Sequence, residues 1–504
     1  MTATVNKIEQ EFLDYVKKMT AYNEALSLIF WDLRTGAPKK GIDQRSEVIG
    51  MLSSEVFAMS TSQEMASFIA RLTQDDEKEL SEITVKLLEE CKKEYDKNKK
   101  IPADEFKEYI VLLSKSESKW EEAKAASDFG MFKPYLEKVI EFNRKFISYW
   151  GYEGNKYNTL LDLYEPGMTV EILDEVFSEL RDRIVPLVKK IAESPNKPET
   201  TFLFKHFSKQ NQRDLSLEIL EELGYDFEAG RLDETVHPFE ITLNTGDVRI
   251  TTKYDESDFR TAVFGTIHEC GHAIYEQNVS PELNGTLLAS GTSMGIHESQ
   301  SLFFENFIGR NFSFWKKNFG LLNKYAEEQF FGVSLDDYYR AINESKPSLI
   351  RIEADELTYP LHVMIRYEIE KALFNGDLQV DDLPKVWNEK YEEYLGVTPS
   401  NDAEGVLQDV HWSGGSFGYF PSYALGYMYA AQFKQSMLKD LPNYDELLES
   451  GNIAPIKEWL SSKIHKHGKM KKPFELLNEI TEEGLNASYL IEYLEEKYAK
   501  IYSL

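Results

Sequence analysis

Cysteine is scarce in this chain, which has only Cys91 and Cys270 among its 504 residues. Two cysteines cannot supply a disulfide framework, and such low usage is typical of proteins from a reducing compartment. Basic residues are also in the minority, because 57 Lys and Arg stand against 86 Asp and Glu, for a net charge of −29. A surface this acidic repels phosphate backbones and anionic lipid headgroups. We therefore expect neither nucleic acid nor a membrane to be the main partner.

We expect neither an export signal nor a membrane span from the sequence. The first 18 residues carry acidic side chains such as Glu9 and Asp14, and no basic segment leads into an apolar one. This pattern predicts no secretory signal and favours a cytoplasmic location. Residues 410–433 contain no Asp, Glu, Lys or Arg and are long enough to span a bilayer. They include His411 and Pro421, however, so we interpret them as a buried stretch that lines a site.

Most of the sequence shows apolar residues at helical spacing, for example Leu136, Val139 and Ile140. Residues 240–253 differ, because β-branched side chains alternate on both sides of Asn244-Thr-Gly246, which is typical of a β-hairpin. The sequence therefore predicts a mainly α fold, with two helical lobes around a deep substrate cleft and a small antiparallel β-sheet. We expect one domain over residues 1–504, with an N-terminal helical region at 1–195 and a second region at 196–504.

One short motif indicates a metal site. In His268-Glu-Cys-Gly-His272 the two histidines are four residues apart, so on a helix they lie on one face and can bind one Zn²⁺. Glu269 projects beside that pair, where it can reach a metal-bound water. Cys270 points away from the histidine face, and we expect it to be a packed small residue. Gly271 would let another backbone or a substrate approach closely.

Two histidines need a third protein ligand, with a fourth position left for water. Glu298 opens a new helical stripe, predicted over 299–318, and lies 26 residues beyond His272, which is room for a turn and an antiparallel return. Glu305 would lie two turns further along the same face and is the alternative. Zn²⁺ is the expected ion, although Co²⁺ or Mn²⁺ suits the same donors.

Six motifs together resemble the carboxypeptidase Taq family of metallocarboxypeptidases. In chain order they are His237-Pro-Phe239, Asp247-x-Arg249-x-Thr251, His268-Glu-x-x-His272, His297-Glu-Ser-Gln300, Ile350-Arg-x-x-Ala-Asp355 and Gly405-x-x-Gln-Asp-x-His-Trp412. All six match without departure. So many ordered motifs are far more specific than the His-Glu-x-x-His string alone. The length of the family and its N-terminal helical region also fit, so we expect the resemblance to cover the whole chain.

The resemblance implies an α-helical, cleft-containing, homodimeric enzyme of the cytoplasm. It implies a metal-dependent hydrolase, supported by zinc or cobalt, that removes residues from peptide C-termini with broad specificity and works poorly before proline. The region at 196–504 would be its catalytic part, and its partners would be peptides with a free C-terminal carboxylate.

A carboxypeptidase must recognise a terminal carboxylate, and this requires a fixed cation. Arg351, expected on a helix that could face the cleft, is the candidate. A structural ion pair is the alternative for this residue. Arg249 stands beside Asp247 in the predicted hairpin, so a structural pair is the favoured interpretation there.

Amide hydrolysis builds negative charge on the carbonyl oxygen, which a neutral imidazole or phenol can stabilise. His411 and Tyr423 are the candidate donors, with Tyr419 as an alternative that could also contact substrate. His237 could bind substrate or serve the structure. Asp355 or Asp409 could orient a ligand histidine, and the sequence does not choose between them.

The predicted mechanism is attack on the scissile amide by a water that is activated by zinc and Glu269. Two alternatives keep the same fold. The first is a helical cleft oligopeptidase that cuts internally, and only the carboxylate clamp distinguishes it. The second is a catalytically silent peptide-binding relative, which the intact Glu269 argues against.

Overall fold

Helices make up nearly all of the regular structure, as predicted. The computed structural model describes residues 2–74 and 80–504. The first helices are α1 (Thr2–Thr35), α2 (Ile42–Ser60), α3 (Gln63–Gln74), α4 (Glu82–Asn98), α5 (Ala103–Ala126), α6 (Phe129–Trp150), α7 (Asn158–Leu161), α8 (Val170–Glu193) and α9 (Lys209–Leu223). The later helices are α10 (Arg260–Gln277), α11 (Met294–Leu302), α12 (Phe312–Tyr325), α13 (Leu335–Ile342), α14 (Tyr359–Asn375), α15 (Leu383–Leu395), α16 (Pro421–Asp440), α17 (Tyr444–Ser450), α18 (Ala454–Lys463), α19 (Pro473–Thr481) and α20 (Ser488–Tyr502).

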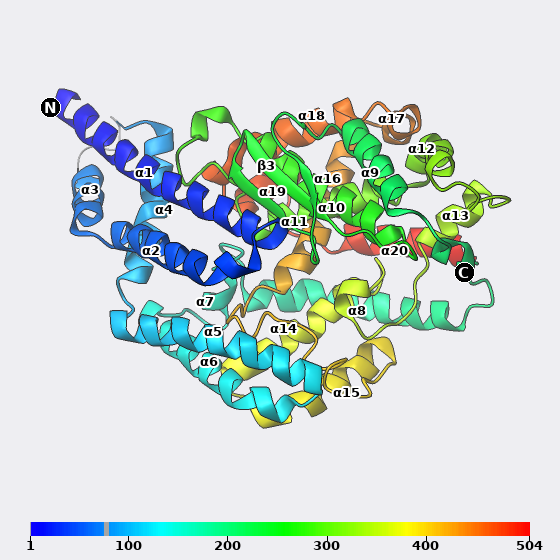
Figure 1. Ribbon diagram of the computed structural model, residues 1–504, viewed down its shortest axis with the longest axis horizontal. Coiled ribbons are helices and arrows are strands. Elements are labelled where there is room, and N and C mark those ends of the chain that lie inside the picture. The colour runs from blue at the N-terminus through cyan, green and yellow to red at the C-terminus, as the bar shows by residue number, and fades with distance from the viewer. Residues whose placement is uncertain (1, 75–79) are drawn as a thin grey trace.

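The helices form two groups, which Figure 1 shows one above the other. Helices α5, α6, α8, α14 and α15 lie in the lower group, and α9, α10, α12 and α18 lie with the sheet in the upper group. Helix α16 packs against α20 and against α11, which contacts α10 of the upper group. It also packs against α14 of the lower group, so it joins the two groups.

Helix α16 contains most of the uncharged stretch at 410–433, and it is buried along most of its length. The interpretation of that stretch as a buried segment is therefore confirmed. Across residues 2–74 and 80–504, none of the helices has both the length and the apolar character that crossing a membrane requires.

The small sheet has three strands in the order β1-β3-β2. Strands β2 (Glu240–Asn244) and β3 (Asp247–Thr252) form the predicted antiparallel hairpin. The expectation of a purely antiparallel sheet is wrong, because β1 (Leu232–Glu234) pairs with β3 in parallel. Residues 229–235 have little β-branched character, and β1 forms within them because this segment makes backbone hydrogen bonds along the open edge of β3. The buried face of β3 packs on α10.

Two glycines allow the central helices to approach closely. A Cβ at position 271 of α10 would lie 2.4 Å from the Gln300 carbonyl oxygen of α11, and a Cβ at Gly426 of α16 would lie 2.7 Å from Glu298 Cβ. Such contacts are far inside van der Waals range, so only glycine fits at either position. The expected close approach of a backbone at Gly271 is confirmed, and Cys270 is fully buried in the core as expected.

Two predicted helices are interrupted. Residues 299–318 do not form one helix, because α11 is followed by a π-helix, η5 (Phe303–Gly309), and a break before α12. The wider turns of η5 keep Phe304 and Phe307 buried. Arg351 does not lie on a long helix either, but in a 3₁₀ turn, η6 (Arg351–Glu353), that precedes α14.

Candidate metal centre

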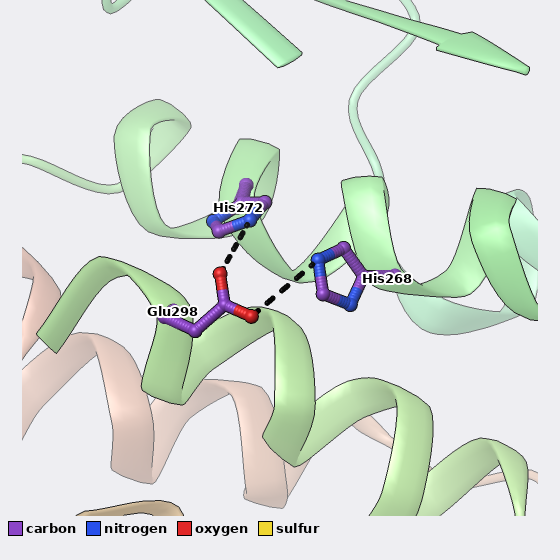
Figure 2. Close-up of side chains that lie close together, drawn as sticks. All are labelled: His268, His272 and Glu298. Carbon is purple, nitrogen blue, oxygen red and sulfur yellow. Dashed lines mark ion pairs between the residues drawn. The ribbon is translucent and has the colours of Figure 1, made fainter. Parts of the chain in front are cut away.

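Helix α10 presents two histidines side by side. Because His268 and His272 are four residues apart, they project from one face of the helix, and their ring centroids lie 5.0 Å apart. Figure 2 shows both rings beside the carboxylate of Glu298 on α11. The Glu298 oxygens lie 4.0 Å from His268 Nε2 and 3.6 Å from His272 Nε2.

These three side chains fit a divalent metal ion. Their donor atoms all lie within 4.8 Å of one another, and donors that bind one tetrahedral zinc at about 2.1 Å are roughly 3.4 Å apart. Burial raises the pKa of the Glu298 carboxyl, an effect that His268 opposes and Glu305 increases. A bound cation would offset the cost of holding this negative charge in the interior.

The start of α11 is held by two acceptors. The Ser293 side chain accepts a hydrogen bond from the Ile296 N–H at 3.1 Å, and Glu165, from the segment between α7 and α8, accepts one from the Gly295 N–H at 2.9 Å. Both bonds satisfy N–H groups that have no partner within the helix. They thereby hold the turn from which Glu298 projects.

Glu305, the alternative third ligand, lies on the other side of His268. Its Oε2 is 3.0 Å from His268 Nδ1, whereas His268 Nε2 faces Glu298. Arg310 Nη2 donates to Glu305 Oε1 at 3.0 Å, and Arg310 Nη1 donates to the Ile342 carbonyl at 2.7 Å. Burial alone would lower the pKa of His268, but the Glu305 bond and the Glu298 charge raise it to about 10. Glu305 therefore has the position of an orienting partner rather than of a ligand.

Asp355 and Asp409 were the candidates for orienting a ligand histidine, and neither makes that contact among the described residues. Among the described residues, Asp355 Oδ1 accepts from the backbone N–H groups of Leu357 and Thr358 and so closes the turn before α14. Asp409 binds two arginines instead of a histidine. The orienting role of Glu305 could not be read from its spacing, because the π-helix changes the direction of its side chain.

The imidazole of His297 packs against that of His272. The rings of His272 and His297 are stacked with centroids 4.5 Å apart. His297 Nε2 lies 3.0 Å from Glu276 Oε1, which also accepts a hydrogen bond from the Gly291 N–H at 2.8 Å. In the sequence His297 belongs to a motif but shows no role of its own, because its stacking on His272 depends on how α10 and α11 pack in the fold.

Glu269 lies next to His268 on α10 and is buried. Burial raises the pKa of its carboxyl to about 7, an effect that His268 opposes and Glu298 increases. A carboxyl group with a pKa near 7 can exist in both protonation states at neutral pH, which general acid–base catalysis requires.

Arg351 is buried, with 5% of its surface exposed, and it makes an ion pair. Its Nε donates to Asp409 Oδ1 at 3.0 Å, and its Nη1 donates to Tyr359 Oη at 3.1 Å. The guanidinium also lies 4.9 Å from the ring centroid of Tyr423. The expected pair of Arg249 with Asp247 is present in the hairpin, with two hydrogen bonds of 2.7 Å.

The structure also brings together the candidate hydrogen-bond donors to the carbonyl oxygen of the substrate. His411 Nε2 lies 3.3 Å from Tyr423 Oη, and the Tyr419 ring packs against both side chains. Burial lowers the pKa of His411 to about 4, although Asp409 opposes this effect. Burial likewise raises the pKa of Tyr423 to about 12, against the influence of Arg351. Both groups are therefore neutral at pH 7 and able to donate hydrogen bonds.

His237 lies apart from these contacts. It is exposed in the segment that leads into β2, and its side chain makes no hydrogen bond or ion pair with other described residues. A cavity of about 660 Å³ is lined by residues 290–294 at the start of α11, by residues 242–244 of β2, and by side chains of α1 and α4, and the proposed metal ligands are not among its lining residues. Tyr164 lines this cavity and packs edge-on against Tyr419, with ring centroids 5.0 Å apart.

The helical fold, the His-Glu-x-x-His helix and the facing Glu298 are typical of a metallopeptidase. Comparisons with known proteins give the family. The profile described as "Carboxypeptidase Taq (M32) metallopeptidase" matches residues 11–498. This chain therefore belongs to the carboxypeptidase Taq (M32) family, and the predicted resemblance is confirmed.

Individual relatives are similar to this chain over nearly their whole length. Carboxypeptidase 1 of Bacillus subtilis is 60% identical over 502 residues, which cover 99% of this chain and 100% of the relative. Thermostable carboxypeptidase 1 of Thermus thermophilus is 40% identical over 511 residues and 98% of each chain. The crystal structure of an M32 carboxypeptidase from Deinococcus radiodurans superposes with a TM-score of 0.96 at 34% identity, covering 99% of this chain and 100% of that one. The predicted class, a metallocarboxypeptidase, is thereby confirmed.

Proposed function

We propose that this enzyme releases C-terminal amino acids from peptides with broad specificity, using a divalent metal ion held by His268, His272 and Glu298. The observation that carries the proposal is the convergence of these donors from α10 and α11, with nitrogen–oxygen distances of 3.6 and 4.0 Å. Zn²⁺ is the expected ion for two imidazoles and one carboxylate with an open position, and Co²⁺ or Mn²⁺ can take the same donors.

Glu269 is the proposed carrier of the proton in both steps of the reaction. His268, His272 and Glu298 would hold the divalent ion, which when bound would supply a Lewis acid for the attacking water and the scissile carbonyl. Glu269 accepts the proton of the water during attack and passes it to the leaving amine. The carboxyl pKa of about 7 supports both steps at neutral pH.

His411 and Tyr423 are the proposed donors to the carbonyl oxygen as its negative charge develops. Their position supports this role, because they lie 3.3 Å apart and both are buried and neutral. In a site that excludes water, donors of fixed orientation stabilise the transition state more than they stabilise the substrate.

Arg351 is the proposed clamp for the C-terminal carboxylate of the substrate. It is a buried cation that lies against Tyr423, and its Nη1 makes one hydrogen bond among the described residues, to Tyr359. Tyr419 and His237 are proposed substrate contacts, Tyr419 through its packing on the donors and His237 through its family motif. The 660 Å³ cavity would hold the peptide on the N-terminal side of the scissile bond.

Further proposals rest on the resemblance. The enzyme would act as a homodimer in the cytoplasm, without nucleic acid or membrane as partners, and its acidic net charge of −29 is consistent with the last point. We also retain the division into an N-terminal helical region at 1–195 and a catalytic region at 196–504. All proposed metal ligands come from the second region.

The direct test is mass spectrometry of a mixed peptide pool after incubation with the enzyme, with and without a strong chelator. A ladder of C-terminal losses that the chelator abolishes is the expected result. Internal cuts would favour the oligopeptidase alternative, and no cleavage by the metal-loaded enzyme would favour the silent peptide-binding relative.

A further inference from the structure

The proposed substrate clamp, Arg351, shares the carboxylate of Asp409 with a second arginine, Arg366. Arg351 Nε lies 3.0 Å from Asp409 Oδ1, and Arg366 Nε of α14 lies 2.6 Å from Asp409 Oδ2. All three side chains are almost completely buried. Two guanidinium groups and one carboxylate leave a net positive charge of one inside the protein.

The two arginines differ in what else they contact. Arg366 is 0% exposed, and its remaining donors meet neutral acceptors. Nη1 donates to the His362 carbonyl at 2.7 Å and to Tyr391 Oη at 3.1 Å, and Nη2 donates to Gln408 Oε1 at 2.8 Å. The Trp387 ring centroid is 4.5 Å from the guanidinium. Protein therefore surrounds Arg366, which cannot reach a substrate.

Arg351, in contrast, lies among the proposed catalytic side chains. It packs over Tyr423, which itself contacts His411, and its Nη1 is engaged by Tyr359 alone among the described residues. If Asp409 bound Arg351 only, that pair would be neutral and would hold little attraction for a further anion. With Arg366 on its other oxygen, Asp409 is already neutralised, and the positive charge of Arg351 is left uncompensated.

We infer that Arg366 is a positioning residue that neutralises Asp409 and so leaves the positive charge of Arg351 uncompensated for the C-terminal carboxylate of the substrate. This inference rests on the proposed clamp role of Arg351 and adds to it a residue outside the six family motifs. Asp409 then has two functions: it fixes the direction of the Arg351 guanidinium, and its charge is cancelled from the buried side.

The test compares binding of two inhibitors to the metal-loaded enzyme. Both are the same short peptide with a reduced final amide bond, one with a free C-terminal carboxylate and one with a C-terminal amide. Arg366→Met should reduce the preference for the acid by about 10-fold or more, because Asp409 would then compensate the charge of Arg351 and weaken its charge-assisted contact with the carboxylate. Affinity for the amide should stay within about 3-fold of wild type, because the amide does not use the charge.

Adding Asp409→Asn to Arg366→Met provides the decisive control. The double variant again has one unneutralised cation, at Arg351, so the preference for the acid should return to within about 3-fold of wild type. Arg366→Lys should also keep the preference, because it keeps the charge although it loses the guanidinium hydrogen bonds. These two variants carry the test if Arg366→Met does not fold.

Several results would overturn the inference. Equal losses for acid and amide in Arg366→Met would show a purely structural role, as would loss of the preference in folded Arg366→Lys or in the folded double variant. The failure of the clamp itself would look different, because wild type would then bind acid and amide equally and Arg351→Ala would change neither.

Discussion

The imidazole of His268 is joined to Glu305 by a hydrogen bond of 3.0 Å between Nδ1 and Oε2. With one proton held on Nδ1, a metal ion can bind Nε2, which faces Glu298, by displacing the proton that Nε2 carries in the metal-free site. Arg310 holds the other Glu305 oxygen at 3.0 Å. A chain of buried groups that passes through the π-helix therefore orients His268 in the proposed metal centre.

Glu305→Gln should weaken metal binding by about 10- to 100-fold, because the amide no longer fixes the tautomer and basicity of His268. Affinity would be measured by competition with a chelator of known strength. Glu495→Gln, which removes a carboxylate that pairs with Arg183 near the surface, is the matched control and should leave the affinity unchanged. Wild-type metal affinity in Glu305→Gln would show that this hydrogen bond does not support the centre.

Glu269→Gln should bind metal normally and lose hydrolysis by about 10²- to 10⁴-fold, because the amide cannot accept the water proton. Glu298→Gln should lose metal itself. Metal content by elemental analysis, combined with rates at saturating metal, separates the two effects. Loss of metal from Glu269→Gln would contradict its assignment as the base.

Gly271→Ala should destabilise the fold by about 1–3 kcal/mol, because its methyl group would meet the α11 backbone at 2.4 Å from the Gln300 carbonyl oxygen. Gly265→Ala, on the same helix with no atom within 4 Å of the added Cβ, is the control and should stabilise by up to about 1 kcal/mol. Thermal unfolding compares them. Similar effects of the two substitutions would contradict the close helix contact.

Glu165 should make stability depend on pH. Burial raises the pKa of its carboxyl from 4.5 to about 7, against the hydrogen bonds of Ser293 and Tyr429. A raised pKa in the folded state means that the stabilising contribution is complete below pH 4.5 and is lost as pH rises through about 7. Glu165→Gln lacks this ionisation, so its stability relative to wild type should rise by up to about 3 kcal/mol between pH 4.5 and 7. Thermal midpoints that differ by a constant amount over this range would contradict the prediction.

Features that depend on residues close together in the chain could be predicted from the sequence, and features that depend on contacts between distant residues could not. The spacing of His268 and His272 is local, and so is the alternation around Gly246, so both were readable from the chain. The parallel strand β1 depends on the edge of β3, and residues 303–309 have the apolar pattern of an ordinary helix, so neither the third strand nor the π-helix had a local signal. Arg366 is 43 residues from Asp409, and their contact exists only in the folded protein.

The central claim is that one metal ion, held by His268, His272 and Glu298, is required for C-terminal hydrolysis. The most direct test is to strip the enzyme with a chelator and titrate Zn²⁺ back while following release of the last amino acid of a peptide. Activity should be absent at the start, rise linearly and level off at about one ion per chain, and Glu298→Gln should not recover over the same range. Full turnover by protein that elemental analysis shows to be free of metal would contradict the account.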